Sequence, residues 1–373
     1  MFLKPSAFLP SLVAAFLWSA PGFAQDGQLR TYYIAAEEVE WDYAPEGRDL
    51  MMGEEFSEDD LVFVGEGPGR IGHIYHKVRF IGYTDDTFTT PMPVEDASRG
   101  ILGPIIHAEV GDTIDVVFQN HATVPTSVHP HGVFYDKASE GSMTLDGTSM
   151  EQMADDHVPP GGAHTYHWSV PERAGPGPND PSSLVWLYHS HVDEVRDTNT
   201  GLIGAIVVTA KGQAKPDGSP LGVDREFFSL FTVMDENQSL FLEQMMEKAH
   251  IAPYGGDGDE EREGPTEDEF GESNLMHSIN GFVFANLPMP SMKVGEKVRW
   301  YVMALGTEVD LHTPHWHGNT VLVGGHRKDV LDLLPATTIV ADMVPDNPGI
   351  WMFHCHVNDH IAAGMTARYE VTP

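Results

Sequence analysis

The sequence predicts an all-β protein made of two homologous β-sandwich domains. Two features of the 373-residue chain predict this fold class. Apolar and polar residues alternate with a period of two in short stretches bounded by Gly, Pro and Asp, which is typical of strands and turns. The second half of the chain also repeats the motifs of the first half in the same order.

Alternating stretches occur along the whole chain and predict strands. The clearest of them are 77–85, 111–120, 204–210, 296–305 and 365–371. Helical periodicity is scarce, and only 239–250, SLFLEQMMEKAH, favours a helix or helical turn.

The repeated motifs divide the chain into two domains. The matching pairs are HAEVGDTIDVVF with SMKVGEKVRWYV, HPHG with HWHG, VWLYHSHVDE with IWMFHCHVND, and GLIGAIVV with AGMTARYE. We therefore predict a first domain at 28–212 and a second at 223–373. A Gly- and Pro-containing linker joins them at 213–222.

The first 24 residues predict a secretory signal peptide. Lys4 gives a positive start, an apolar run covers 8–18, and Gly22-Phe23-Ala24 offers a small-residue cleavage site. A membrane anchor is the alternative, but the run is short and interrupted by proline. We expect an exported protein, periplasmic or secreted, with no membrane insertion.

Charge and cysteine content exclude several classes of protein. The net charge of −35 would repel nucleic acids and anionic membranes. Cys355 is the single cysteine, so no intramolecular disulfide can form. An unpaired thiol in an exported chain is either a reactive liability or a metal ligand, and its neighbours His354 and His356 favour a ligand.

Four His-x-His pairs point to a metal centre. In a strand, residues i and i+2 face the same side, so each pair directs two imidazoles one way. The pairs stand at matching places in the two repeats, which core packing does not explain. They are His129 with His131, His189 with His191, His315 with His317, and His354 with His356.

Cys355 has a ligand set of its own, on the opposite face of its strand. His312 precedes it, and His360 and Met365 follow it. Two imidazoles, a thiolate and a weak thioether form the donor set of a blue-copper electron-transfer site. Zinc is the competing metal, but an axial methionine is foreign to zinc sites.

The motifs HTPHWHG and HCHVNDHIAAGM resemble the C-terminal copper signature of the multicopper oxidases. The stretches YYIAAEEVEWDYAP, GPGRIGHIYHKVRFIGYTDDTF and ILGPIIHAEVGD are most similar to the repeats of ceruloplasmin and hephaestin. The two-domain format resembles the small laccases. The resemblance implies that both domains are cupredoxin-like Greek-key β-sandwiches.

The resemblance also implies four coppers per chain, namely one type 1, one type 2 and two type 3. The type 1 ligands would be His312, Cys355, His360 and Met365, and the type 2 ligands His129 and His315. One type 3 ion would take His131, His189 and His356, and the other His191, His317 and His354. The first repeat has Thr126, Ser190, Val195 and Thr200 at the type 1 positions, so it would supply trinuclear ligands only.

Assembly follows from the same resemblance. In small laccases the second domain of one subunit meets the first domain of the next in a ring of three, so we expect a homotrimer with its trinuclear clusters at the interfaces. A monomer that closes the cluster within one chain is the alternative.

The implied reaction is one-electron oxidation of a small reducing substrate at type 1 copper, coupled to reduction of O2 to water at the trinuclear cluster. Tyr135, six residues after His129, matches a tyrosine near this cluster in small laccases and would supply an electron or proton. A packing role is the alternative.

The substrate is left open between phenols or aromatic amines, as for a laccase, and Fe(II), as for a ferroxidase. Glu272, His277 and Asp359 resemble the iron-holding residues beside type 1 copper in ceruloplasmin, and Glu308 matches a carboxylate from the adjoining repeat. The acidic segment 257–272 is either a solvated mobile loop or a guide for cations. Oxidation of Cu(I) is also possible, but no dense methionine-rich insert supports it.

Two other functions compete with the oxidase. A copper nitrite reductase would need only three imidazoles at its catalytic copper, and a copper-storage protein or electron carrier would need no trinuclear set. The copper content distinguishes them, at four per chain for the oxidase, two for the reductase and one for a carrier.

Overall fold

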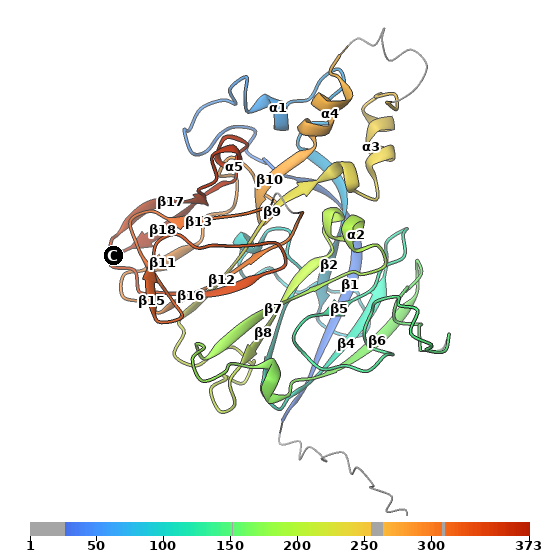
Figure 1. Cartoon of the computed structure of the whole chain (residues 1–373), viewed down its shortest axis with the longest axis vertical. Coiled ribbons are helices and arrows are strands. Elements are labelled where there is room, and N and C mark those ends of the chain that lie inside the picture. Colours follow the sequence, from blue (N-terminus) through green and yellow to red (C-terminus); the bar gives the residue numbers. More distant parts are fainter. Residues whose placement is uncertain (1–26, 151, 255–263, 308–309) are drawn as a thin grey trace, which may run out of the picture.

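Figure 1 shows the computed structural model of the chain, which describes residues 27–150, 152–254, 264–307 and 310–373. The predicted signal peptide, residues 257–263 and Glu308 lie outside the described residues. Strands dominate, as the alternating sequence predicts, and the all-β fold class is confirmed. Among the described helices, none is long and apolar enough to cross a bilayer.

The first half of the chain forms two sheets that face each other across an apolar core. One sheet has the strand order β2 (Ile74–Tyr83), β1 (Leu29–Asp42), β4 (Thr113–Asn120) and β6 (Ala163–Ser169). The other has the order β3 (Ile105–Glu109), β8 (Ile203–Thr209), β7 (Ser183–His189) and β5 (His129–Pro130). Every second residue of β4 is buried, which is the period that places one face of a strand in the core.

The second half repeats this arrangement. One sheet has the order β10 (Leu275–Ile279), β9 (Arg225–Asp235), β12 (Val298–Ala304), β16 (Thr338–Met343), β14 (Val321–Val323) and β15 (His326–Lys328). The other has the order β11 (Ser291–Lys293), β18 (Thr366–Thr372), β17 (Gly349–Cys355) and β13 (Pro314–Trp316). Trp300, Trp316 and Phe353 fill the core between these sheets.

Strand pairing confirms that the halves are structural repeats. In both, the first strand runs parallel to a later one, as β1 does to β4 and β9 does to β12. The short histidine-bearing strands pair equivalently, with His129 opposite His189 and His315 opposite His354. Two His-x-His pairs are therefore adjacent in each half.

Short helices cap and connect the strands. They are α1 (Leu61–Val64), α2 (Glu194–Thr200), α3 (Leu242–Lys248), α4 (Glu267–Ser273) and α5 (Asn358–Ala362), with 3-10 turns η1 (Ala97–Arg99), η2 (Glu172–Ala174) and η3 (Glu236–Gln238). The helix predicted within 239–250 is confirmed as α3.

The acidic segment 257–272 is not a loop throughout, which corrects one of the two expectations for it. Its end forms α4, because Thr266 caps the helix and Glu269 completes a capping box with it. Glu267, Asp268 and Glu269 also lie in the first helical turn, where the helix dipole favours negative charge.

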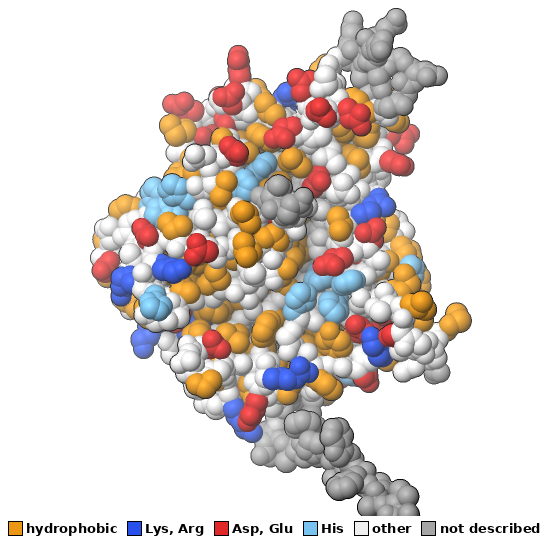
Figure 2. Space-filling view, viewed as in Figure 1, with side chains coloured by type: hydrophobic (Ala, Val, Ile, Leu, Met, Phe, Trp, Pro, Cys, Tyr) orange, Lys and Arg blue, Asp and Glu red, His pale blue; other side chains and the backbone are white. Residues whose placement is uncertain are grey.

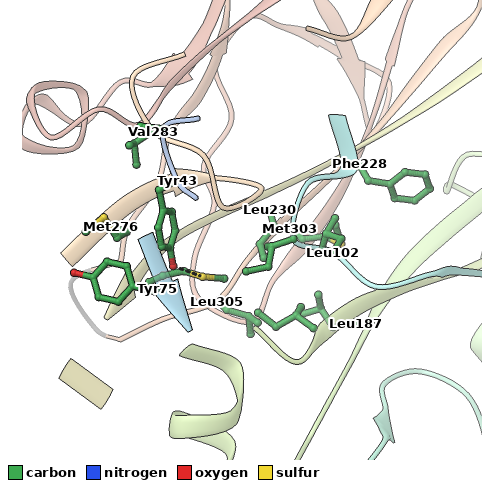
Figure 3. Close-up of a cluster of buried hydrophobic side chains, with 14 of the residues drawn as sticks. Tyr43, Tyr75, Leu102, Leu187, Phe228, Leu230, Met276, Val283, Met303 and Leu305 are labelled. Atoms are coloured by element: carbon green, nitrogen blue, oxygen red, sulfur yellow. Dashed lines mark hydrogen bonds between the residues drawn. The ribbon is translucent and has the colours of Figure 1, made fainter. Parts of the chain in front are cut away.

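The two halves share a buried apolar cluster. Figure 3 shows Tyr43, Leu102 and Leu187 of the first half against Leu230 and Met303 of the second. Residues 213–222, between β8 and β9, contain a turn that is closed by an antiparallel bridge between Ala214 and Pro220. The domain boundaries at this turn stay a prediction.

Lys77 of β2 and Glu236 of η3 form an ion pair between the halves, and both side chains are fully buried. Tyr43 donates a hydrogen bond to the same Glu236 Oε1 at 2.5 Å. We expect Lys77→Met to lower the free energy of unfolding by about 3–5 kcal/mol, because it leaves a buried carboxylate without its cation. Adding Glu236→Gln should recover most of this loss. Urea unfolding of both variants measures it, and equal destabilisation by the single and double variants would contradict it.

Candidate metal centres

The predicted type 1 ligands converge at the C-terminal end of β17, where Cys355 lies. His312 Nδ1 lies 3.2 Å from His360 Nδ1, and Cys355 Sγ lies 3.9 Å and 3.6 Å from these two nitrogens. Met365 is fully buried, its N–H donates to the His360 carbonyl, and its own carbonyl accepts from Cys355 N–H. The structure therefore gathers the residues that the sequence assigned to one copper.

The chemistry of these groups fits a copper ion. Burial raises the pKa of Cys355, but hydrogen bonds from His312 and His360 outweigh it and bring the pKa down to about 6. The thiol can therefore supply a thiolate, the form of cysteine that binds metal ions. The N–H of Thr313 also donates to Cys355 Sγ at 3.4 Å.

Asp310 lies beside His312, a predicted type 1 ligand, and is not among the residues that the sequence assigned to the site. Its Oδ1 lies 3.5 Å from His312 Nε2, on the opposite side of the ring from Cys355. Burial lowers the pKa of His312, but the contact with Asp310 raises it. A carboxylate on the second nitrogen of a metal-binding histidine fixes the ring and its tautomer. Its position two residues before His312 was the only indication in the sequence.

The second half carries one group of histidines that fits a trinuclear centre. Ligand atoms of His315, His317 and His354 lie within 4.8 Å of one another. His315 Nδ1 contacts the Asp329 carbonyl at 2.9 Å, so its Nε2 remains available to a metal. The His317 and His354 Nε2 atoms are 3.1 Å apart, a separation suited to two ligands of one ion.

The first half repeats this geometry. His129 Nδ1 contacts the Glu140 carbonyl at 2.6 Å, and the Nε2 atoms of His131 and His189 are 3.0 Å apart. Burial lowers the pKa of His131 and of His189 to about 4, which keeps both imidazoles neutral and able to bind metal. Glu194, which the sequence analysis did not assign, lies 3.3 Å from His191 Nε2 through its Oε2.

The two groups of histidines lie apart. Among the described residues, the ring contacts of the His-x-His pairs stay within their own half. Figure 2 shows histidine side chains gathered in separate surface patches. Each group is thus half of the eight-histidine set that the resemblance implies.

A cavity of about 710 Å³ opens beside His360 and contains most of the predicted iron-site residues. Glu272, His277 and Asp359 line it, and Asp310 lies at its inner wall. The His277 ring is 5.2 Å from the His360 ring, and burial lowers the pKa of His277 to about 4. Glu308 lies outside the described residues.

Tyr135 lies beside the first-half histidines. Its ring centroid is 5.8 Å from that of His129, in an edge-to-face arrangement. Burial raises the pKa of Tyr135, so its phenol stays protonated at neutral pH. This position is compatible with both the redox and the packing interpretation.

Sequence comparison assigns the chain to a family. Residues 89–213 and residues 261–373 match two family models, each described as multicopper oxidase. The chain belongs to the multicopper oxidase family. The two matched ranges of this multicopper oxidase contain all four His-x-His pairs and the predicted type 1 ligands.

Curated relatives of this multicopper oxidase are much longer. It is 45% identical over 345 residues to mouse ferroxidase HEPHL1, 43% identical over 352 residues to rat hephaestin, and 42% identical over 353 residues to rat ceruloplasmin. These matches cover 92% to 93% of the chain but only 29% to 32% of the relatives. The chain therefore spans about a third of their length.

Solved structures confirm the fold. A crystal structure titled multicopper oxidase aligns with a TM-score of 0.56 at 18% identity, covering 92% of this chain and 89% of that one. The blue copper oxidase from Nitrosomonas europaea aligns with a TM-score of 0.54 at 17% identity, covering 92% and 86%. These similarities confirm the cupredoxin-like fold of the multicopper oxidase.

Proposed function

We propose that the protein oxidises Fe(II) one electron at a time and couples four such oxidations to reduction of O2 to water. The observation that carries this proposal is the convergence of Glu272, His277 and Asp359 in the cavity beside His360. Curated relatives named ferroxidase support it. Laccase-like oxidation of phenols is the second candidate, since the apolar residues Val233, Leu275 and Leu305 line the same cavity.

Copper, when bound, supplies the one-electron redox chemistry at the type 1 residues and the O2 chemistry at the eight paired histidines. The carboxylates of Glu272 and Asp359 would attract Fe(II) and stabilise Fe(III) more strongly, which favours electron loss. Cys355 is bonded through the backbone to His354 and His356, so one segment of chain links the type 1 residues to the trinuclear ligands.

We also propose a homotrimer in an exported, periplasmic or secreted location, with four coppers per chain. The separation of the two histidine groups supports assembly, because among the described residues each group makes its ring contacts within its own half, and a trinuclear centre needs both groups. Exposed apolar side chains in both halves, among them Phe134, Val195, Leu322 and Ile350, are available to an interface.

Glu272→Ala tests the substrate. We expect kcat/KM for Fe(II) to fall by at least about 10–100-fold, the effect of losing a residue that supports a metal ligand from outside. The kcat/KM for a phenol should stay unchanged. Asp268→Ala is the matched control, because Asp268 is an exposed acid of the same helix that does not line the cavity. Equal Fe(II) kinetics in the two variants would reject the iron site and favour the laccase.

A further inference from the structure

The first repeat keeps the backbone scaffold of a type 1 site without its ligands. In the second repeat, Thr313 N–H donates to Cys355 Sγ, and Thr313 Oγ1 accepts from the N–H of His356 at 3.1 Å. In the first repeat, the N–H of Ser127 donates to Ser190 Oγ at 3.0 Å, and Ser127 Oγ accepts from His191 N–H at 2.9 Å. Ser190 therefore occupies the place of Cys355 in the same hydrogen-bonded frame.

The side chain of Ser190 contacts a buried carboxylate, that of Asp197. Ser190 Oγ donates to Asp197 Oδ2 at 2.6 Å, and the N–H groups of Val192 and Asp193 donate to the same oxygen at 3.0 Å and 3.2 Å. Asp197 is 1% exposed, and its carbonyl accepts from Leu202 N–H at 3.1 Å. One buried residue of α2 thus ties together the end of β7, the turn after it and the start of β8.

The connections of Asp197 correspond to those that a bound type 1 metal would make in the second repeat. There, a metal would join Cys355 to His360 of α5, the helix that follows the strand, and their Sγ and Nδ1 atoms lie 3.6 Å apart. Here, Asp197 joins Ser190 to α2, the helix at the matching place. Three hydrogen bonds to one buried carboxylate oxygen are costly to lose, because each donor would be left unpaired.

We propose that Asp197 is a positioning residue that braces the His189-Ser190-His191 segment in place of a type 1 metal, and so sets the direction of both histidines at the trinuclear centre. This inference rests on the proposed function, since it assumes that these histidines bind copper. Asp197 itself contacts neither metal nor substrate; it acts through Ser190 and the backbone of the following turn.

The geometry gives a conservative rescue. All three donors meet one oxygen of Asp197, so the side-chain oxygen of asparagine can accept the same three hydrogen bonds. Asp197→Asn should keep the brace, and Asp197→Ala should remove it. Asp193→Ala is the matched control, because it removes the side-chain cap of the same helix at Arg196 N–H and leaves the contacts of Asp197 in place.

The measurement is copper per chain in the loaded protein after dialysis against a chelator, together with blue absorbance as an internal measure of the type 1 site. We expect wild type, Asp197→Asn and Asp193→Ala to keep the full complement. Asp197→Ala should fall toward a single copper with its blue absorbance retained. If Asp197→Ala does not fold, Ser190→Ala, which removes only the hydroxyl, is expected to show the same selective loss.

Two results would overturn the inference for different reasons. Full retention of copper by Asp197→Ala, or by Ser190→Ala in its place, would show that the brace does not position the histidines. A wild type that keeps only one copper would instead overturn the proposed oxidase, and the inference with it.

Discussion

Cys355→Ser is expected to abolish oxidase activity, with kcat falling by more than about 100-fold, the upper end of the effect of losing an outer partner of a metal ligand. Cys355 is the only thiol in the chain, and its sulfur lies within 3.9 Å of Nδ1 of both predicted type 1 histidines, His312 and His360. Serine offers a hard oxygen in place of a soft thiolate, so the site should lose its copper and its blue absorbance.

The fold should survive this change, because the first repeat already tolerates serine at the matching position. Ser190 accepts from Ser127 N–H as Cys355 does from Thr313 N–H. The control for the thiol is Ser190→Cys, which adds a thiol where Thr126, Val195 and Thr200 provide neither imidazole nor thioether, so it should gain no blue absorbance. Oxygen consumption, copper content and thermal unfolding of Cys355→Ser check this, together with the blue absorbance of Ser190→Cys.

Two outcomes would contradict the assignment of the type 1 site. If Cys355→Ser retains its blue absorbance, the thiolate is not a ligand. If Ser190→Cys gains blue absorbance, the other ligands do not decide where the type 1 site forms.

Local geometry explains why the convergence of the candidate ligands could be predicted. His354 in β17 and His356, the first residue after it, place their rings 5.4 Å apart, as residues i and i+2 of an extended chain do, while Cys355 between them lies against His312 and His360. His360 follows within one short helix, so it returns to the same place. The His-x-His pairs of the first half could then be predicted because they stand at the matching positions of the internal repeat.

Contacts set by packing could not be predicted in this way. Asp310, Glu194 and Asp197 are single acids in an acidic chain, and only the folded arrangement shows that each one lies against a ligand or its neighbour. The sequence did not predict the helix α4, because the high acidic content of 257–272 favoured a loop over the helix that its capping residues indicate. Acidic composition suggests a loop, whereas Thr266 and Glu269 decide the local structure.

Mixing two inactive variants should restore activity, and this is the second large effect we expect. One variant carries His189→Ala and His191→Ala, which leaves the first-half group incomplete. The other carries His317→Ala and His354→Ala, which leaves the second-half group incomplete. Each alone should be inactive, because every trinuclear site then misses two imidazoles that its geometry requires.

In a ring that contains both variants, the two incomplete groups of histidines can lie at different interfaces. A heterologous interface takes one group of histidines from each of two neighbouring subunits, so an interface is complete when both contributed groups are intact. Random mixing of equal amounts makes about a quarter of the interfaces complete, since each group is intact with a chance of one half. Co-refolded mixtures should therefore recover about a quarter of the wild-type activity per chain.

The type 1 residues are intact in both variants, so recovery reports on the trinuclear interface alone. A mixture of one variant with a chain that carries all four substitutions is the control, and it should stay inactive because no interface in it is complete. If co-refolded rings of the expected size form and no activity returns, each trinuclear site takes both groups from one chain. The two groups of histidines would then have to come together within a single subunit when copper binds.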